Sequence, residues 1–314
     1  MEQSVESGRF IRRIGSPPRR GSPKTFLSGM ERSLWFNSYN SGHKTRLGGD
    51  SQANHAVSIK AMVKVLDLIE EDAAAAAEQS SLEESRQLIK VGAYLAVCTV
   101  GSLRGHEGFY TDLAGLRKHI TYGQEGSIPA NWDLRRILSS DECASLPHVV
   151  LTLLGKFKGE KGTDHHKIGL ASTTMSGIKS RWWIEQLIEV NEAEGKVSGP
   201  AFSTPASTPK LAMSWTYDLE FKRYLKLVQT QYEDERLIPP EAKVDELYGT
   251  FRTPRKTAET RAKQAGIGKQ DVDAMNRWSK VDKAKGRQPK LTMNEHYTDC
   301  LLMMPITWRY SYAL

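Results

Sequence analysis

Hydrophobic residues recur at helical spacing along the stretch that begins at Ala56. Apolar positions three or four residues apart share one face of a helix, so this stretch predicts an amphipathic helix that continues into an Ala-rich extension. The next stretch, Glu83–Thr99, is apolar on almost every face, which predicts a largely buried helix. Gly101 follows it, and glycine is typical of a helix end. The apolar positions of the first helix are Val57, Ile59, Met62, Val65, Leu66 and Ile69.

The middle of the chain changes to β-branched composition. His148–Leu154 (HVVLTLL) has the composition of a strand, and Lys167–Ala171 can pair with it across the polar segment KGEKGTDH. These segments predict a β-hairpin with a basic tip. His165 and His166 lie beside Asp164 at that tip, but adjacent residues do not easily bind one metal ion. We therefore expect an exposed turn there and no metal site.

The rest of the pattern is mainly helical. Ser176–Ala193 has the amphipathic spacing of a helix, and the Pro-, Ser- and Gly-rich stretch 195–210 predicts a surface loop. Further helices are expected at 217–232, 241–248, 254–265, 269–278 and 294–304. The pattern predicts an α+β fold that is mainly α with a small antiparallel β-sheet.

Composition excludes several classes of protein. No apolar run reaches the roughly 18 residues that a membrane span needs, and the first residues are polar and rich in Arg and Pro where a signal peptide is apolar. We expect an intracellular protein without a membrane partner. Cys98, Cys143 and Cys300 are odd in number and far apart, which favours buried or incidental thiols over disulfides or a zinc cluster.

Positive charge concentrates in two zones of a chain whose net charge is +7. Residues 251–290 contain twelve Lys and Arg against four Asp and Glu, and residues 1–50 contain nine against four. The N-terminal zone includes SPPRRGSPK and shows no sustained periodicity, so residues 1–55 are predicted to be a flexible basic arm. A basic run is often only a solvated face, but two such zones favour an acidic partner such as nucleic acid.

Residues suited to phosphodiester chemistry occur in four segments of fixed order. They are SLRGHEGFYTDLAGLRKHI (102–120), LLGKFKGEKG (153–162), YGTFRTPRKTAETRAKQAGIGKQDVDAMNRW (248–278) and NEHYTDCLL (294–302). Their order and spacing resemble the catalytic domain of the tyrosine recombinases, or phage-integrase family. Within it they look most like the eukaryotic recombinases of DIRS-like and Crypton-like mobile elements. The resemblance covers roughly residues 85–312.

The resemblance implies a role for each matching residue. The family has an Arg after a buried helix with an acidic residue three positions later, a hairpin Lys, an (His/Lys/Arg)-x-x-Arg pair, a later Trp or His, and a nucleophilic Tyr. The matching residues are Arg104 with Glu107, Lys158, Arg252 with Arg255, Trp278 and Tyr297. Further DNA contacts are expected from Lys256, Arg261, Lys263, Arg277 and Lys280.

The chain departs from the family pattern in two places. Arg252 stands where His is commoner, and 18 residues separate Trp278 from Tyr297, which is longer than usual. The extra length implies an inserted basic loop near 280–291. A second loop insertion is expected near 195–210. Some assignments have close competitors: Lys156 and Lys161 compete for the role of the hairpin lysine, and Tyr310 and Tyr312 for that of the nucleophile. We expect both tyrosines to follow the last helix and to pack as a tail.

Physical chemistry accounts for these residue types. Attack on a phosphodiester increases negative charge around phosphorus, and two guanidiniums can donate hydrogen bonds to its nonbridging oxygens. Cationic neighbours favour the phenolate form of a tyrosine nucleophile, and a lysine can protonate the leaving 5′ oxygen. Each residue also has an ordinary structural interpretation. Arg104 could cap a helix and pair with Glu107, and Trp278 alone would be a core residue.

The resemblance implies a site-specific recombinase or integrase that cuts and rejoins double-stranded DNA through a 3′-phosphotyrosine. No cofactor or metal is expected. Residues 56–314 would form the catalytic domain, with the family's N-terminal clamp domain reduced or missing. The resemblance also implies a homotetramer on DNA and a nuclear location. Two alternatives stay open: a noncatalytic DNA-binding remnant of a mobile element, and a type IB topoisomerase.

Overall fold

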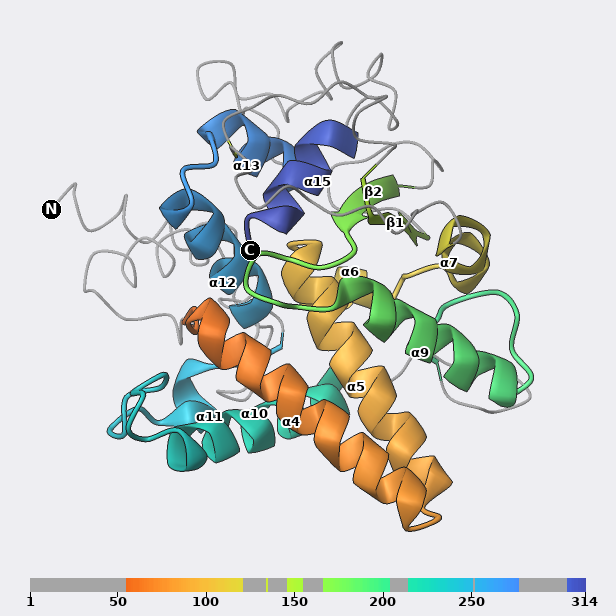
Figure 1. The fold of residues 1–314 in the computed structure, drawn as a ribbon, viewed down its shortest axis with the longest axis horizontal. Coiled ribbons are helices and arrows are strands. Elements are labelled where there is room, and N and C mark those ends of the chain that lie inside the picture. The colour runs from red at the N-terminus through yellow and green to blue at the C-terminus, as the bar shows by residue number, and fades with distance from the viewer. Residues whose placement is uncertain are drawn as a thin grey trace, which may run out of the picture. The chain divides into compact units, whose positions relative to one another are not determined.

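The structure is a computed structural model that describes residues 55–120, 134, 146–154, 166–203, 214–250, 252–276 and 304–314. The chain divides into two units, Met1–Ala53 and Asn54–Leu314, and all described residues belong to the second. Over the described residues this unit is mainly helical with a small antiparallel sheet, as predicted (Figure 1). None of the helices described here combines the length and the apolar character that a membrane crossing needs.

The elements keep the order of the chain. The helices are α4 (Ile59–Glu78), α5 (Leu82–Val100), α6 (Gly105–Gly108), α7 (Leu113–His119), α9 (Ser180–Ala193), α10 (Ser214–Gln231), α11 (Val244–Leu247), α12 (Thr253–Gln264), α13 (Lys269–Met275) and α15 (Met304–Tyr312). The strands are β1 (His148–Leu153) and β2 (His166–Ala171).

Helices α4 and α5 lie side by side, and the buried residues of both belong to the hydrophobic core (Figure 1). Helix α4 begins where the Ser58 side chain accepts a hydrogen bond of 3.1 Å from the backbone N–H of Ala61. From Leu88 to Val100 every residue of α5 is buried, Cys98 included. Both predicted helices are therefore confirmed, and so is the burial of this one cysteine.

Helix α9 packs across α5 at a glycine. A Cβ atom added at Gly92 would lie 2.2 Å from the ring of Trp183, so only glycine allows this approach. Helix α9 is confirmed, but it begins at Ser180 and not at Ser176. The residues before it form a turn, in which Gly177 has a φ of +98° and the backbone N–H of Ile178 donates to the Thr174 hydroxyl.

The two strands form the predicted hairpin, with His148 opposite Ala171 and Leu153 opposite His166. His166 is thus part of β2, which corrects its assignment to the turn, while His165 and the rest of the tip lie outside the described residues. Side chains of α15 cover the edge of β2. The backbone N–H groups of Gly169 and Ala171 donate to the hydroxyls of Thr307 and Ser311, at 3.1 and 2.8 Å.

The stretch after α9 differs from the prediction of a surface loop. Phe202 is buried and packs edge-on to Tyr94, with ring centroids 5.5 Å apart. The side-chain amide of Asn191 donates to the carbonyl oxygen of Ala201 at 3.1 Å, which anchors the segment to α9. The many Pro, Ser and Gly residues of this stretch favoured a surface loop, although the apolar pair Ala201 and Phe202 belongs to the core. Residues 204–213 lie outside the described part of the chain.

The C-terminal third is helical as predicted, with differences at its ends. Helices α10, α12 and α13 match the prediction, and α11 is a single turn. Most of the helix expected at 294–304 lies outside the described residues, and Met304 begins α15. Tyr310 and Tyr312 therefore lie on this helix, and the prediction that they follow the last helix was wrong. Pro305 in its first turn was a signal for a helix start, because proline needs no hydrogen-bond acceptor there.

Candidate active site

The segment after α5 is held tightly against that helix, which places Arg104 and Glu107. The hydroxyl of Tyr94 donates to the carbonyl oxygen of Gly105 at 2.7 Å. At Gly108 an added Cβ atom would lie 2.5 Å from the Cys98 sulfur, so glycine is needed for the contact. The Leu103 side chain is buried in the same core. The backbone around Arg104 is therefore fixed on both sides by packing onto α5.

Glu107 is the centre of the site. Its carboxylate accepts two hydrogen bonds of 2.9 Å from Arg104, one from the backbone N–H and one from Nη1 of the guanidinium. The Glu107 side chain is fully buried, whereas the Arg104 side chain is 35% exposed. The carboxylate therefore fixes one side of the Arg104 guanidinium, while about a third of the Arg104 side chain stays exposed.

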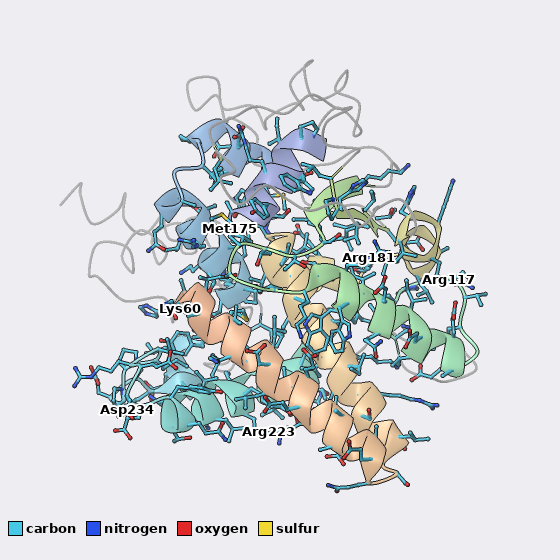
Figure 2. The ribbon with its side chains drawn as sticks, in the orientation of Figure 1. Lys60, Arg117, Met175, Arg181, Arg223 and Asp234 are labelled. Carbon is cyan, nitrogen blue, oxygen red and sulfur yellow. The ribbon has the colours of Figure 1, made fainter. Side chains whose placement is uncertain are left out.

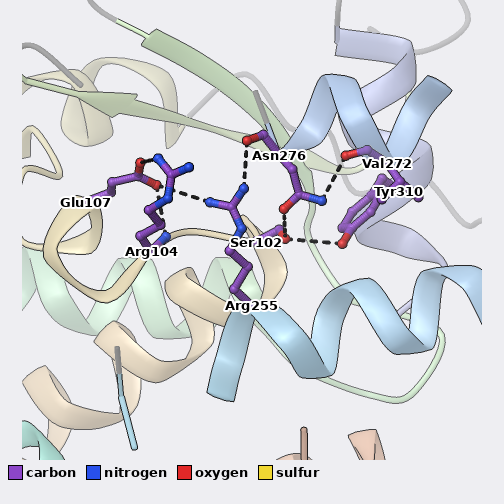
Figure 3. Close-up of polar contacts among 7 residues, drawn as sticks. All are labelled: Ser102, Arg104, Glu107, Arg255, Val272, Asn276 and Tyr310. Carbon is purple, nitrogen blue, oxygen red and sulfur yellow. Dashed lines mark hydrogen bonds and ion pairs between the residues drawn. The ribbon is translucent and has the colours of Figure 1, made fainter. Parts of the chain in front are cut away.

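Arg255 reaches the same carboxylate from α12. Its Nη1 lies 3.8 Å from Oε2 of Glu107, and its Nη2 donates to the backbone carbonyl oxygen of Asn276 at 2.7 Å (Figure 3). The Arg255 side chain is 9% exposed. Two arginines that are 151 positions apart in the sequence thus meet at one buried acid.

The charges of these three residues do not cancel. Two guanidiniums face the single carboxylate of Glu107, so the group carries a net positive charge. Burial strengthens this charge toward a bound anion because water screens it less. Arginine stays protonated under such conditions, and its planar fork matches the oxygens of a phosphate. The arrangement can hold a phosphodiester and stabilise the charge that develops on it during attack.

Surface arginines elsewhere in the structure are arranged differently. Arg117 of α7 pairs with Glu192, and Arg223 of α10 pairs with Glu220. Both arginines are labelled in Figure 2. Both guanidiniums are partly exposed and lie within 3 Å of an acid that is itself partly exposed. Pairs of this kind contribute little to stability and present no surplus of buried charge. The pairing of two arginines with one buried acid distinguishes the Arg104 site from them.

Three further residues complete the network in Figure 3: Ser102 and Asn276, which the sequence did not single out, and Tyr310, which it offered only as a competing nucleophile. The Ser102 hydroxyl donates to Oδ1 of Asn276 at 2.9 Å, and the Tyr310 hydroxyl lies 3.2 Å from the Ser102 oxygen. All three side chains are fully buried. Burial raises the pKa of Tyr310 to about 12, although the Ser102 hydrogen bond and the charge of Arg255 act in the opposite direction. A buried phenol of this kind is a poor candidate for attack on a DNA phosphate.

The other predicted basic residues that the structure describes lie on or next to α12. Arg252 is exposed and immediately precedes the helix. Lys256 and Arg261 are half-buried, and Lys263 is exposed and pairs with Glu259. The same helix therefore carries Arg255 on its buried face and lysines at its surface.

The remaining predicted residues lie outside the described part of the chain. They are Lys158 with its competitors Lys156 and Lys161, and Arg277, Trp278, Lys280 and Tyr297. The structure therefore brings together Arg104, Glu107 and Arg255, and it gives no position for the hairpin lysine, the tryptophan or the expected nucleophile. In the described ranges, no group of three or more His, Cys, Asp or Glu side chains is placed to hold a metal ion.

No protein-family model, curated protein or solved structure matches this chain.

Proposed function

We propose that this protein is a DNA strand transferase of the tyrosine-recombinase type. The observation that supports the proposal is the meeting of Arg104 and Arg255 at the buried carboxylate of Glu107. Two arginines held by one acid form a cationic site whose natural ligand is a phosphate. These three residues are also among the seven that carry the sequence resemblance to the recombinases.

The proposed reaction is transesterification at a DNA phosphodiester. Arg104 and Arg255 hold the nonbridging oxygens, with Arg252 assisting from the start of α12. The Tyr297 oxygen attacks phosphorus, the bond to the 5′ oxygen breaks, and a 3′-phosphotyrosine forms. Lys158 donates a proton to the leaving 5′ oxygen, and Trp278 positions the tyrosine. Attack by a 5′ hydroxyl reverses these steps and rejoins the strand, so no nucleotide cofactor is consumed.

The charge distribution supports double-stranded DNA as the partner. Lys256, Arg261 and Lys263 lie on α12, the helix that carries Arg255, and Arg277 and Lys280 continue the basic run in the sequence. Cations that contact phosphates release bound counterions and give salt-dependent affinity. On this proposal the protein acts on DNA in the nucleus as an oligomer, with four copies assembled on two sites.

A covalent-adduct assay with random DNA sequences tests the proposal and does not require a defined target site. The full chain is incubated with a pool of random-sequence duplexes, each carrying a nick, so that cleavage near the nick releases a short strand and traps the adduct. We expect an adduct that survives denaturing electrophoresis, that protease digests, and that Tyr297→Phe abolishes.

Two other outcomes identify the alternatives. Salt-sensitive DNA binding without an adduct on any substrate indicates a noncatalytic DNA-binding remnant of a mobile element. Relaxation of a supercoiled plasmid of unrelated sequence, abolished by the same Tyr297→Phe variant, indicates a type IB topoisomerase. A recombinase requires its own site and therefore leaves such a plasmid supercoiled.

A further inference from the structure

A buried chain of hydrogen bonds connects Arg255 to the C-terminal helix. The guanidinium of Arg255 donates to the backbone carbonyl oxygen of Asn276 at 2.7 Å. The side-chain oxygen of the same asparagine accepts a hydrogen bond of 2.9 Å from Ser102, and the Ser102 oxygen lies 3.2 Å from the hydroxyl of Tyr310 (Figure 3). The chain therefore joins the end of α13, the segment after α5, and α15.

Asn276 is held at both ends of its side-chain amide. The amide nitrogen donates to the carbonyl oxygen of Val272 at 2.9 Å, while the amide oxygen accepts from Ser102. Asparagine combines a donor and an acceptor in one short side chain, which suits this position. These two side-chain bonds, together with the backbone N–H of Asn276 that donates to the carbonyl oxygen of Val272 at 3.0 Å, restrict rotation of the Asn276 carbonyl away from Arg255. The contact to the arginine is thus made by the backbone, and the side chain determines where that backbone lies.

Ser102, which lies in the middle of this chain of hydrogen bonds, has an unfavourable backbone conformation. Its φ is +48°, in the left-handed region that glycine adopts more easily, and the residue is fully buried. Strain of this kind persists where the surrounding structure requires it and is concentrated at functional sites. Glycine would fit the backbone, but it would not supply the hydroxyl that contacts both Asn276 and Tyr310. Ser80, at φ +64°, is a useful contrast because it is exposed.

We infer that Ser102 and Asn276 are positioning residues that hold the Arg255 guanidinium in place for a phosphate, and that Tyr310 ties this pair to the C-terminal helix. The inference rests on the proposed function, because that function gives Arg255 a phosphate to hold. Ser102 and Asn276 are buried beside Arg255 and act on the phosphate through it. The hydroxyl of Tyr310 belongs to this support, which gives that tyrosine a role other than attack.

The expected effect follows from the sensitivity of phosphoryl transfer to geometry. A misplacement of about 1 Å in a group that contacts the reacting phosphate lowers a rate by on the order of 100-fold. Asn276→Ala keeps the backbone carbonyl that contacts Arg255 but removes both side-chain hydrogen bonds that help to fix it. We expect this variant to lower the rate of adduct formation by about 10- to 100-fold and to change overall DNA affinity by less than about 3-fold, since many phosphate contacts share that affinity.

The test follows the Arg255 guanidinium directly by ¹⁵N NMR of the full chain. The Arg255 signals are assigned by their loss in Arg255→Lys. In the native protein we expect separate Nη signals, because the hydrogen bond to Asn276 and the ion pair with Glu107 restrict rotation of the group. Asn276→Ala and Ser102→Gly should shift or merge these signals, and Tyr310→Phe should produce a smaller shift in the same direction. Ser80→Gly, which relieves the same backbone strain at an exposed turn, should leave them unchanged.

Failure of the inference is separable from failure of the proposed function. Unchanged Arg255 signals in Asn276→Ala and Ser102→Gly overturn the positioning role, whether or not the native protein forms an adduct. The absence of an adduct with the native chain overturns the proposed function and leaves the NMR result valid. Thermal unfolding identifies any variant that does not fold. If Asn276→Ala does not fold, the Arg255 signals of Ser102→Gly and Tyr310→Phe test the positioning role instead, because Ser102→Gly removes only a hydroxymethyl group and Tyr310→Phe only a hydroxyl group.

Discussion

The carboxylate of Glu107 accepts two hydrogen bonds from Arg104, one from its backbone and one from its guanidinium, each 2.9 Å long. The acid therefore performs two tasks. It satisfies a backbone N–H at the start of α6, as an acidic residue at the third helical position often does. It also orients a guanidinium whose outer part is exposed. The short helix and the candidate site thus depend on the same side chain.

Removal of the Glu107 carboxylate should destabilise the protein strongly. Glu107→Ala leaves Arg104 and Arg255 without the buried acid that they share, and the loss of one partner from a buried ion pair costs about 3–5 kcal/mol. Chemical denaturation should show a decrease of this size in the free energy of unfolding, and a smaller decrease for Glu107→Gln. The matched control is Glu185→Gln, which breaks a partly exposed pair with Arg181 and should cost less than about 1 kcal/mol. Equal decreases in the free energy of unfolding for Glu107→Ala and Glu185→Gln would show that the buried carboxylate of Glu107 contributes no more than an exposed one.

Lysine should not replace the arginine of α12. Arg255→Lys keeps the positive charge near Glu107, but it removes the planar fork that donates to Asn276 while lying beside Glu107 and that the proposed reaction needs for its phosphate. The rate of adduct formation should fall by about 10²- to 10³-fold, as when one donor to a developing oxyanion is lost. Arg223→Lys makes the same exchange at a surface pair with Glu220 and should leave the rate within about 2-fold. A native rate in Arg255→Lys would remove this residue from the reaction.

The crossing of α5 and α9 should not tolerate a methyl group at Gly92. A Cβ atom there would meet the buried Trp183 ring at 2.2 Å, and overpacking of this kind costs about 1–3 kcal/mol. Gly92→Ala should therefore lower the melting temperature by several degrees. Gly268→Ala provides the control, since an added Cβ atom meets nothing within 4 Å at that position. A melting temperature for Gly92→Ala equal to that of the control would show that the helices approach less closely.

The ion pairs of Glu194 should make stability fall in acid. Burial alone would raise the pKa of Glu194, but hydrogen bonds and charges from Lys90 and Lys196 hold it below its ordinary value. A carboxyl with a lowered folded-state pKa binds protons more weakly in the folded protein than in the unfolded chain. Its stabilisation is therefore complete above its ordinary pKa of about 4.3 and is lost as the pH falls through the folded-state value.

Unfolding free energies measured from pH 7 to pH 3 test this expectation. Glu194→Gln should be less stable than the native chain at pH 7, by about 1–3 kcal/mol, and this difference should shrink as the solution becomes acidic. Burial also lowers the pKa of the partner Lys90, so the glutamine variant is preferable to a change at the lysine. Glu192→Gln, in an exposed pair with Arg117, should show a difference below about 1 kcal/mol across this range. A constant difference for Glu194→Gln would contradict the lowered pKa.

The sequence predicted most of the regular elements because their burial is periodic. Helices α4 and α5 follow from apolar spacing, and the hairpin follows from two β-branched runs with a polar connection. Two shorter helices were not predicted, because only a single residue at the start of each one marks it in the sequence. Helix α7 depends on the Asp112 side chain, which accepts a hydrogen bond from the Gly115 backbone, and α15 begins beside Pro305. Such local signals are too common in sequences to decide alone.

The candidate site was predicted only in part, for a related reason. Arg104, Glu107 and Arg255 could be proposed because charged residues at fixed spacings carry a recognisable pattern. The contacts of Ser102 with Asn276 and with Tyr310 could not be predicted, because they join positions 174 and 208 residues apart, and Tyr310 was proposed only as a competing nucleophile. A buried Ser or Asn has no distinctive pattern in a sequence, and its role depends on which segments the fold brings together.

Mapping the tyrosine that becomes attached to DNA decides whether Tyr297 is the nucleophile. The adduct formed on the nicked random pool is digested with nuclease and protease, and mass spectrometry identifies the peptide that keeps a nucleotide on tyrosine. We expect a 3′-nucleotide on Tyr297, formed in the native chain and absent from Arg104→Ala and Arg255→Ala. Attachment to Tyr310 or Tyr312, or a native amount of adduct in either arginine variant, would contradict this expectation.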